Sequence, residues 1–374
     1  MGTIGADVCS VFRERYRREP RMARAPGRVN LIGEHTDYND GFVLPVAIDR
    51  YCLVAFEANR DRLLRGYSLA EEEEREMPLA GLAPSGSWLD YAAGTVLAHI
   101  ETGMEVPGMD FVVGGDLPIG AGLSSSAAFE LAVARAVAFL SGAGFRPENE
   151  ARLSQRAEND FVGVPCGIMD QMAIALAREG TALLLDCRDL SFEHVPIPES
   201  FRVVVLDTGT RRKLATSAYE ERRKSCEEAA RRLGVPKLRD ATPDSIAALP
   251  ESLRSRARHV VEENRRTLEM ARALAESDGS RVGRLMAESH QSLRTLFEVS
   301  SPALDAMVKI ASRHPAAVGA RMTGAGFGGS AVALVHSKEA ESFVREVSSE
   351  YVRETANPGR LHVCRAVSGA SILP

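Results

Sequence analysis

The chain has 374 residues, of which 45% are apolar and 26% charged; these are ordinary globular proportions, unlike those of a disordered tail, a collagen or a coiled coil. At about 150 residues per domain, the length allows two domains or one large one. The 46 Lys and Arg residues stand against 51 Asp and Glu, a net charge of −5, so neither nucleic acid nor an anionic membrane is expected as the main partner. Any phosphate site must therefore be local.

Cysteine usage and the apolar stretches indicate the compartment. The six cysteines are scattered without any Cys-x-x-Cys pair, which argues against a zinc site and a disulfide scaffold. Residues 11–18 are too charged for a signal peptide, and the most apolar helical stretch, residues 127–140, is interrupted by Glu130 and Arg135. We expect reduced thiols, no membrane span and a cytoplasmic location.

In the first half of the chain, predicted strands and helices alternate. Short apolar runs with few breakers predict strands at residues 43–58, 111–113 and 183–185. Ala, Leu and Arg at helical spacing predict helices at residues 124–140, 150–161 and 168–178. We place a domain boundary near residue 180, where Glu179 and Gly180 end a helix.

The second half has the pattern of an α+β domain. Strands are predicted at residues 201–206 and 331–335. Between them, three charge-laced helices are predicted at residues 218–233, 252–276 and 282–297.

Runs of like charge are explained by solvated surfaces. Residues 71–74 are all Glu, which is typical of a solvated loop or helix face. The basic clusters at residues 211–213 and 222–224 are interleaved with acidic residues such as Glu220 and Glu227. We therefore expect a salt-bridged exposed helix rather than a nucleic-acid surface.

A glycine turn followed by serines occupies residues 118–128, after a strand and at the start of an Ala-rich helix. Gly120 and Gly122 permit backbone conformations that other residues avoid, and the N–H groups of a helix start favour an anion. The serine hydroxyls add donors and a candidate magnesium ligand. No Gly-Lys-Ser/Thr follows, so this is not a Walker A loop. The segment predicts a phosphate site, with a serine-capped helix as the alternative.

The polar segment 26–39 contains Arg28, Glu34, His35 and Asp37 among apolar residues. Carboxylates accept hydrogen bonds from neighbouring hydroxyls, and an imidazole can donate or accept, so the cluster suits a polyhydroxyl ligand such as a sugar. A loop that caps itself with Asp and Asn is the alternative. Metal binding is also open, although the cluster lacks a helical His-x-x-x-His spacing.

Two carboxylates form the third signal. Glu158 lies near the end of a predicted helix, and Asp170 follows a tight turn made by Pro165 and Gly167. The turn places Asp170 in the first turn of the next helix, where the dipole favours an ionised carboxylate, although such an Asp can also be only a cap. A glycine loop at residues 323–330 is a weaker signal that a hairpin explains equally well.

Together these four segments resemble the galactokinases, a family within the superfamily of small-molecule kinases that includes homoserine, mevalonate and phosphomevalonate kinases. Residues 27–39 are similar to the galactokinase signature itself, whereas segments 118–128 and 324–329 are shared across the superfamily. Residues 166–171 and 289–294 are also similar to galactokinase segments. The resemblance therefore covers nearly the whole chain.

The resemblance implies an α+β fold of two kinase domains, residues 1–180 and 181–374, with the active site in the cleft between them. It implies ATP-dependent phosphorylation of the anomeric C1 hydroxyl of α-D-galactose to galactose 1-phosphate, the first committed step of galactose catabolism. Galactose and ATP would be the partners and Mg²⁺ the cofactor, with no nucleic acid and no membrane involved. The oligomeric state is left open, a monomer included.

Carried over position by position, the resemblance makes Asp170 the base or electrostatic partner at the reacting hydroxyl and Arg28 its cationic neighbour. Tyr219 would close over the sugar, and Trp88 and Tyr91 would lie near the adenine. The full set of implied binding positions is Glu34, His35, Asp37, Gly167 and Tyr219 for the sugar; Trp88, Tyr91, Gly120, Ala121, Gly122, Leu123, Ser124 and Ser125 for ATP; and Ser126 and Glu158 for Mg²⁺.

Phosphoryl transfer needs positioning and charge neutralisation more than covalent assistance, so Mg²⁺, the helix start and Arg28 would supply most of the stabilisation. An aspartate held ionised by Arg28 is a weak base, so Asp170 either accepts the proton late or acts through its field. The departures from the family pattern are small. Ala121 and Ala325 stand where many relatives have Gly, which is expected to stiffen each loop without removing a ligand.

Two alternatives remain open at this point. An N-acetylgalactosamine kinase shares these motifs and differs chiefly in the room around the C2 substituent of the sugar. A catalytically inert galactose and ATP sensor would act by contacting a protein partner. Such sensors can lack part of the Ser-Ser-Ser-Ala loop, whereas residues 124–128 are complete in this chain, which favours an enzyme.

Overall fold

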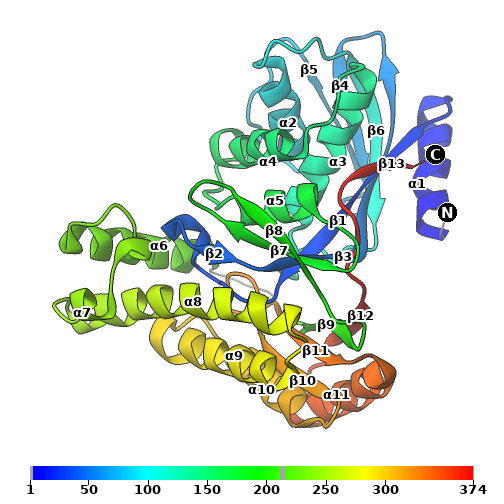
Figure 1. The fold of residues 1–374 in the computed structure, drawn as a ribbon. Helices are drawn as coiled ribbons and strands as arrows, with labels where there is room; N and C mark the ends of the chain where they lie inside the picture. Colours follow the sequence, from blue (N-terminus) through cyan, green and yellow to red (C-terminus); the bar gives the residue numbers. More distant parts are fainter. Residues whose placement is uncertain (1–2, 211–214, 374) are drawn as a thin grey trace.

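The computed structural model describes residues 3–210 and 215–373, and within them the strands form three sheets (Figure 1). The largest is a six-stranded sheet in the order β13-β1-β3-β6-β4-β5. Its strands are β1 (Arg21–Asn30), β3 (Pro45–Asn59), β4 (Leu63–Ser68), β5 (Glu73–Pro78), β6 (Gly108–Gly115) and β13 (Ser371–Leu373). Neighbours are antiparallel except β4 and β6, which are parallel. Because β13 pairs with β1, the end of the chain returns to the first sheet.

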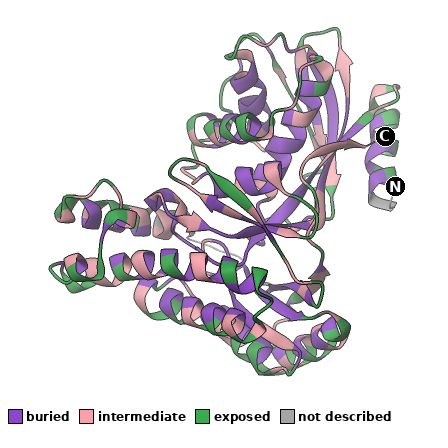
Figure 2. Cartoon of the chain, viewed as in Figure 1, coloured by how far each residue is buried: buried purple, intermediate pink, exposed green. Residues whose placement is uncertain are grey.

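Helices cover both faces of this sheet. They are α1 (Thr3–Tyr16), α2 (Asp90–Ile100), α3 (Ser125–Leu140), α4 (Pro147–Arg156) and α5 (Met169–Leu176). Alternate residues of β3 face opposite sides: Leu53 and Ala55 pack with α1, whereas Val54 and Phe56 belong to the larger core that includes α3. Figure 1 shows α1 alone on its side, with α2 to α5 on the other. Helix α3, built largely from Ala and Val, is buried over most of its length between the sheet and these helices (Figure 2).

The second half of the chain builds a four-stranded antiparallel sheet in the order β10-β11-β9-β12. Its strands are β9 (Phe201–Asp207), β10 (Ala317–Met322), β11 (Ser330–His336) and β12 (Arg360–Cys364), and its helices are α6 (Ala215–Leu233), α7 (Pro243–Ile246), α8 (Glu251–Ala275), α9 (Gly279–Ser292), α10 (Pro302–Arg313) and α11 (Ala340–Thr355). In β9, Val203 and Val205 share a core with α8 and α9, whereas Val204 and Leu206 share one with α10 and α11. The sheet is therefore covered on both faces.

A small third sheet links the two halves. Strand β2 (Phe42–Val43), from the first half, pairs with β7 (Thr181–Asp186), which pairs in turn with β8 (Phe192–Pro196). The proposed boundary at residue 180 thus falls just before β7. That boundary stays a prediction.

The predicted elements are confirmed, with ends that differ by a few residues. Two predicted helices change character near their C-terminal ends: α4 continues as a π-helical turn at Ala157–Val162, and α9 continues as another at Leu293–Phe297. Both π turns lie beside the pocket described below, in keeping with the frequent use of such turns at functional sites.

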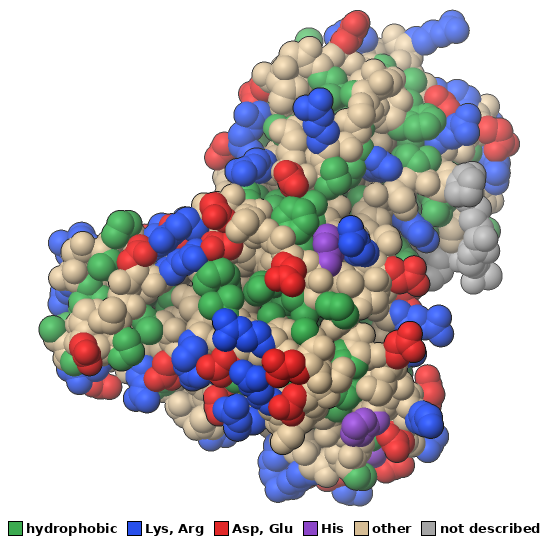
Figure 3. Space-filling view, viewed as in Figure 1, with side chains coloured by type: hydrophobic (Ala, Val, Ile, Leu, Met, Phe, Trp, Pro, Cys, Tyr) green, Lys and Arg blue, Asp and Glu red, His purple; other side chains and the backbone are tan. Residues whose placement is uncertain are grey.

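The charge runs are partly as expected. Arg223 pairs with Glu227 on α6, and Figure 3 shows basic and acidic side chains mixed over α6 and α8. Arg222, however, is buried and donates to the backbone carbonyl of Phe297, so it is wrong to place it on the exposed face. Glu71 and Glu72 lie in a turn, whereas Glu73 and Glu74 lie in β5. The prediction of a loop or helix face is therefore wrong for the second half of this Glu run. The cluster at 211–213 lies outside the described residues.

None of the described helices combines the length and apolar character needed to cross a membrane.

Candidate active site

A pocket of about 590 Å³ is lined by residues from both halves of the chain. From the first half come the end of β1, the polar loop after it, the glycine–serine loop before α3, and the segment leading into α5. From the second half come the start of α6 and the glycine loop after β10. All of the site residues predicted from the sequence line this pocket except Trp88, Ala121 and Glu158.

The wall of the pocket contains an arginine–carboxylate pair. Arg28 Nε and Nη2 donate to the two Asp170 oxygens over 2.7 and 2.6 Å, and Ser124 Oγ donates to the same carboxylate. Arg28 is 5% exposed, whereas the Asp170 side chain is 28% exposed. Asp170 lies in the first turn of α5, as predicted. The carboxylate is therefore fixed from behind by a cation and still reaches the open space of the pocket.

Strand β1 also holds the glycine–serine loop in place. The Arg28 backbone N–H donates to the Leu123 carbonyl over 3.1 Å, and Arg28 Nη1 donates to the Gly122 carbonyl over 2.8 Å. Gly27 makes this approach possible, since a Cβ there would lie 2.9 Å from the Leu123 carbonyl oxygen. Ala121 is buried beneath the loop, and its carbonyl accepts from Ser330 Oγ over 2.7 Å.

The start of α3 lies beside Asp170 and follows a loop of residues with positive φ. Gly120 and Gly122 have φ values of 71° and 78°, and Ser124, the residue before α3, has φ 59°. The Ser124 side chain makes no capping bond to α3, because it donates to Asp170 instead. The alternative of a serine-capped helix is therefore wrong for Ser124, and the start of α3, which lines the pocket at Ser125 and Ser126, has no side-chain cap from this residue.

Glu158 lies behind the pocket wall on the first π-helical turn. Its Oε2 accepts from Gln171 Nε2 over 2.7 Å, and its carboxylate also bonds with Ser126. Burial, followed by the charge of Asp170, raises the pKa of Glu158 to about 7. Glu130, buried on α3, shares the Gln171 amide over 3.3 Å. These are hard oxygen donors crowded together, the type of group that Mg²⁺ prefers.

The polar loop after β1 reaches the other side of the pocket. Asp37 is on a 3₁₀ turn, Asp37–Asn39, and it packs so tightly on Gly167 that a Cβ at Gly167 would lie 1.7 Å from Asp37 Oδ2. Burial, followed by the charge of Asp170, raises the pKa of Asp37 to about 6. The loop also caps itself in part, since Asn39 donates to the His35 carbonyl over 2.9 Å and the Asp37 carboxylate accepts from backbone N–H groups of its own turn. The described residues contain no group of three or more His, Cys, Asp and Glu side chains placed for a metal.

His35 lies among aromatic rings. Its Nδ1 is 2.9 Å from the Tyr38 hydroxyl, and its ring centroid is 4.6 Å from that of Phe297 and 5.8 Å from that of Tyr219. Tyr219, on α6, lines the pocket as expected of a residue that closes over a ligand.

The two predicted adenine neighbours differ in position. Tyr91 lines the pocket, but Trp88 packs edge-on against Phe111 at 6.0 Å and near Phe129 at 6.2 Å, away from the pocket lining. The assignment of Trp88 to the adenine stays a prediction.

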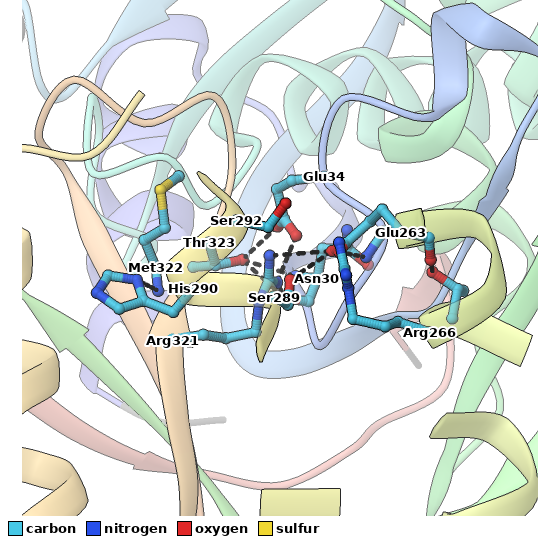
Figure 4. Close-up of polar contacts among 12 residues, drawn as sticks. Asn30, Glu34, Glu263, Arg266, Ser289, His290, Ser292, Arg321, Met322 and Thr323 are labelled. Atoms are coloured by element: carbon cyan, nitrogen blue, oxygen red, sulfur yellow. Dashed lines mark hydrogen bonds and ion pairs between the residues drawn. The ribbon is translucent and has the colours of Figure 1, made fainter. Parts of the chain in front are cut away.

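Sequence reasoning missed Arg321, one of the three residues that support Glu34. Its Oε1 accepts from the Gly324 N–H over 3.0 Å and from Thr323 Oγ1 over 3.2 Å, and its other oxygen pairs with Arg321 (Figure 4). Arg321 stands two positions before the predicted glycine loop, and a lone Arg within an apolar strand was the available signal.

Comparisons with known proteins identify the class first. Three family models match the chain: the galactokinase galactose-binding signature at residues 10–58, the GHMP kinase N-terminal domain at 90–178 and the GHMP kinase C-terminal domain at 270–353. The mevalonate kinase of Methanococcus jannaschii has the same fold, with a TM-score of 0.70 over 94% of this chain and 100% of that one at 18% identity. The chain thus has the two-domain GHMP kinase fold, and the fold prediction is confirmed.

Relatives that match over nearly the whole chain identify the family within this class. The chain is 46% identical to a galactokinase of Roseiflexus sp. (strain RS-1), over 96% of this chain and 94% of the relative, and 45% identical to one of Thermococcus kodakarensis, over 93% and 99%. The crystal structure of Lactococcus lactis galactokinase complexed with galactose matches with a TM-score of 0.93 at 32% identity, over 98% of each chain. The chain belongs to the galactokinase family, and it is an ATP-dependent sugar kinase.

Proposed function

We propose that this chain transfers the γ-phosphoryl group of ATP to the C1 hydroxyl of α-D-galactose, the first committed step of galactose catabolism. The observation that carries the proposal is the Asp170 carboxylate, held by Arg28 and Ser124 at the pocket wall directly beside the uncapped start of α3. A hydroxyl acceptor and a phosphate donor would meet between these two features. The galactose-binding signature at residues 10–58 and the galactokinase relatives support galactose as the acceptor.

The sugar would lie against the loop after β1. Carboxylates at Glu34 and Asp37, with His35 between them in sequence, offer fixed hydrogen-bond partners to several hydroxyls of one ring. Gly167 would let the sugar and Asp37 approach the backbone, because a side chain there would displace the carboxylate. Tyr219 would close the pocket from α6.

The nucleotide would lie on the opposite side. The loop from Gly120 to Ser125 would hold the phosphates with backbone N–H groups, and the positive end of the α3 dipole favours their charge. Tyr91, from α2, borders the same space. Ala121 and Leu123 would act through the shape of the loop.

Mg²⁺ fits the donor set beside this loop. The Ser126 hydroxyl and the Glu158 carboxylate would hold it, and the elevated pKa of Glu158 indicates a site where a carboxylate lacks a compensating cation. When bound, Mg²⁺ supplies neutralisation of phosphate charge.

The residues of the chain then act as follows. Oxygen O1 of the sugar attacks the γ-phosphorus, the bond from that phosphorus to the bridging oxygen of ADP breaks, and the hydroxyl proton leaves O1. Asp170 orients the hydroxyl and either takes this proton late or stabilises its departure through its charge. Arg28 holds the Asp170 carboxylate through two hydrogen bonds and fixes the phosphate loop through Gly122 at the same time.

We also infer a cytoplasmic location from the cysteines. All six lie in the described part of the chain, and none forms a disulfide.

A panel of sugars tests the proposal. Galactose, N-acetylgalactosamine and glucose are each incubated with Mg-ATP, and ADP release is followed. We expect turnover with galactose far above that with the other two sugars. A preference for N-acetylgalactosamine would contradict the proposal in favour of the C2-substituted substrate, and binding of galactose and ATP without ADP release would indicate a sensor.

A further inference from the structure

Arg321, on β10, is the largest fully buried side chain of the described residues. Burying a guanidinium is costly unless it is paired and hydrogen-bonded, so its partners indicate its purpose. It pairs with Glu34, lies 3.6 Å from Glu263, and donates to the carbonyls of Asn30 and Leu31 over 3.3 Å each (Figure 4). All of these partners except Glu263 belong to the strand and loop that lead to the sugar cluster.

Three residues from one short segment of the second half hold the Glu34 carboxylate in place. Its three partners, Arg321, Thr323 and the Gly324 N–H, are close together in sequence at the end of β10 and the start of the glycine loop. Glu34 is 2% exposed yet lines the pocket. The second half of the chain therefore fixes the orientation of a side chain that the first half presents to the sugar.

Glu263 and its own partners lie behind Arg321 and help to hold it in place. Glu263, on α8, accepts from Arg266 Nε over 2.7 Å, from Ser289 Oγ, and from the N–H of Gly33, the residue before Glu34, over 3.2 Å. Burial raises the pKa of Glu263, but Arg266 and the neighbouring charges more than offset this and hold it at about 2. Negative and positive groups thus alternate along the row Glu34, Arg321, Glu263 and Arg266.

The remaining groups that face this row are uncharged near neutral pH. Burial lowers the pKa of His259, on α8, and of His290, on α9, to about 4 each. His259 Nε2 donates to the Glu34 backbone carbonyl over 3.1 Å, and its Nδ1 accepts from Ser292 Oγ over 2.8 Å. Arg321 is therefore the cation that balances Glu34.

We propose that Arg321 is a positioning residue that holds the Glu34 carboxylate in a fixed orientation for a hydroxyl of the sugar. The inference rests on the proposed function, because only there is Glu34 a sugar ligand. Arg321 itself does not line the pocket, so it acts through Glu34.

The pH dependence of sugar binding distinguishes this role from a merely structural one, because it depends on the charge of Glu34. Burial raises the pKa of Glu34, whereas Arg321 and the Gly324 N–H oppose that rise. Without Arg321, burial and the charge of Glu263 act together, and the carboxylate takes up a proton at higher pH. A protonated Glu34 is a weaker acceptor, so sugar binding should weaken further as the pH falls.

The test compares Arg321→Met with Arg266→Met, a matched loss of a buried, ion-paired arginine that does not touch Glu34. KM values for galactose and ATP, and kcat, are measured from pH 6 to pH 9. In Arg321→Met the galactose KM should rise by roughly 10-fold or more, increasingly at lower pH, with the ATP KM nearly unchanged. Arg321→Lys should restore the pH profile. Arg266→Met should lower the melting temperature without changing the galactose KM.

The double variant Glu34→Gln/Arg321→Met covers the case in which Arg321→Met does not fold, since replacing both members of a buried pair is often neutral for stability. Its galactose KM should equal that of Glu34→Gln alone, because Arg321 acts only through Glu34. A further large rise in the double variant, or a wild-type galactose KM in Arg321→Met or Glu34→Gln, would overturn the inference. Failure of the wild type to phosphorylate galactose would instead overturn the proposed function.

Discussion

Two arginine–carboxylate pairs flank the same pocket, and they differ in how much of the carboxylate is open. In the Arg28–Asp170 pair the arginine is buried and the carboxylate side chain is 28% exposed. In the Arg321–Glu34 pair the side chains are 0% and 2% exposed. The first pair lies within the first half of the chain, whereas the second joins the two halves.

The difference in exposure indicates that the two carboxylates have different roles. A carboxylate with an open face can follow a hydroxyl whose proton leaves, because its charge is still accessible to the reacting atoms. A carboxylate enclosed by three protein partners can only accept from a hydroxyl that arrives in one pose. We therefore expect changes at the first pair to affect turnover, and changes on the sugar side to affect which sugar is used.

The largest expected effect comes from breaking the open pair. Asp170→Asn keeps the shape of the side chain but removes its charge, so kcat should fall by roughly 10²-fold or more. Galactose should still bind, as calorimetry would show. Turnover like that of the wild type would remove the catalytic role and leave Asp170 with a structural one.

The next prediction concerns Glu158, on the nucleotide side of the pocket. Glu158→Ala should abolish most turnover and raise the magnesium concentration needed for half-maximal rate, because Mg²⁺ takes few protein ligands. Galactose binding should be nearly intact. Glu130→Gln is the matched control, since Glu130 is buried and shares the Gln171 amide. A collapse of galactose affinity with an unchanged magnesium requirement would show that Glu158 serves the sugar side.

Asp37 tests the sugar side directly. Asp37→Ala should reduce the kcat/KM ratio of galactose to glucose, its C4 epimer, by roughly 10- to 150-fold, the worth of one hydrogen bond to a charged group. An axial C4 hydroxyl can meet a fixed carboxylate that an equatorial one does not reach. Both sugars are measured at saturating Mg-ATP, and the ATP KM serves as the control. An unchanged ratio would mean that another group distinguishes the axial from the equatorial C4 hydroxyl.

Most of the predicted site residues do line one pocket, and they could be found in the sequence because they are clustered in short polar or glycine-rich segments. Arg28, Asp37 and Asp170 stand out among apolar neighbours or just after turns, and the structure brings them to one pocket. The strands and helices that were predicted from apolar spacing are also present in the structure, although elements such as β1, α2 and α10 were not predicted. Pattern alone also suggested that Ser124 caps α3, which the structure contradicts.

What could not be predicted is the pairing over long sequence separation. Arg321 is a single charged residue within an apolar strand, and nothing in the charged helix α8 distinguishes the buried Glu263 from its partly exposed neighbour Glu262. Their role exists only once β10 and α8 pack beside the loop after β1. The contacts of Trp88 with Phe111 and Phe129 could likewise not be predicted from its position in the sequence.

Gly167 offers a smaller perturbation of the sugar side. In Gly167→Ala, the added Cβ would lie 1.7 Å from Asp37 Oδ2, so the carboxylate must move. We expect the galactose KM to rise by roughly 10-fold, the lower end of the loss of one charged hydrogen bond, with little change in the ATP KM. Combining Gly167→Ala with Asp37→Ala should cause little further rise, because the second change removes the clashing group. Full additivity of the two effects would show that Gly167 acts on something other than Asp37.

The smallest expected effect is the pH dependence of galactose use. Burial and the charge of Asp170 raise the pKa of Asp37 to about 6, so its carboxylate is ionised above that pH and protonated below it. Because kcat/KM reports the free enzyme, the value for galactose should rise with pH through about 6 and be roughly fourfold lower at pH 5.5 than at pH 8.

The two pairs can be separated in this profile. Asp37→Asn should remove the inflection near pH 6, whereas Asp170→Asn should move it to lower pH, since the charge of Asp170 helps to raise the pKa of Asp37. Galactose binding followed by calorimetry suits the second variant, whose turnover is low. Glu158, with a pKa of about 7, would also titrate nearby, and saturating magnesium should suppress that contribution by favouring its ionised form. An inflection that persists in Asp37→Asn at saturating magnesium would assign the titration to another group and remove the electrostatic link between the sugar side and Asp170.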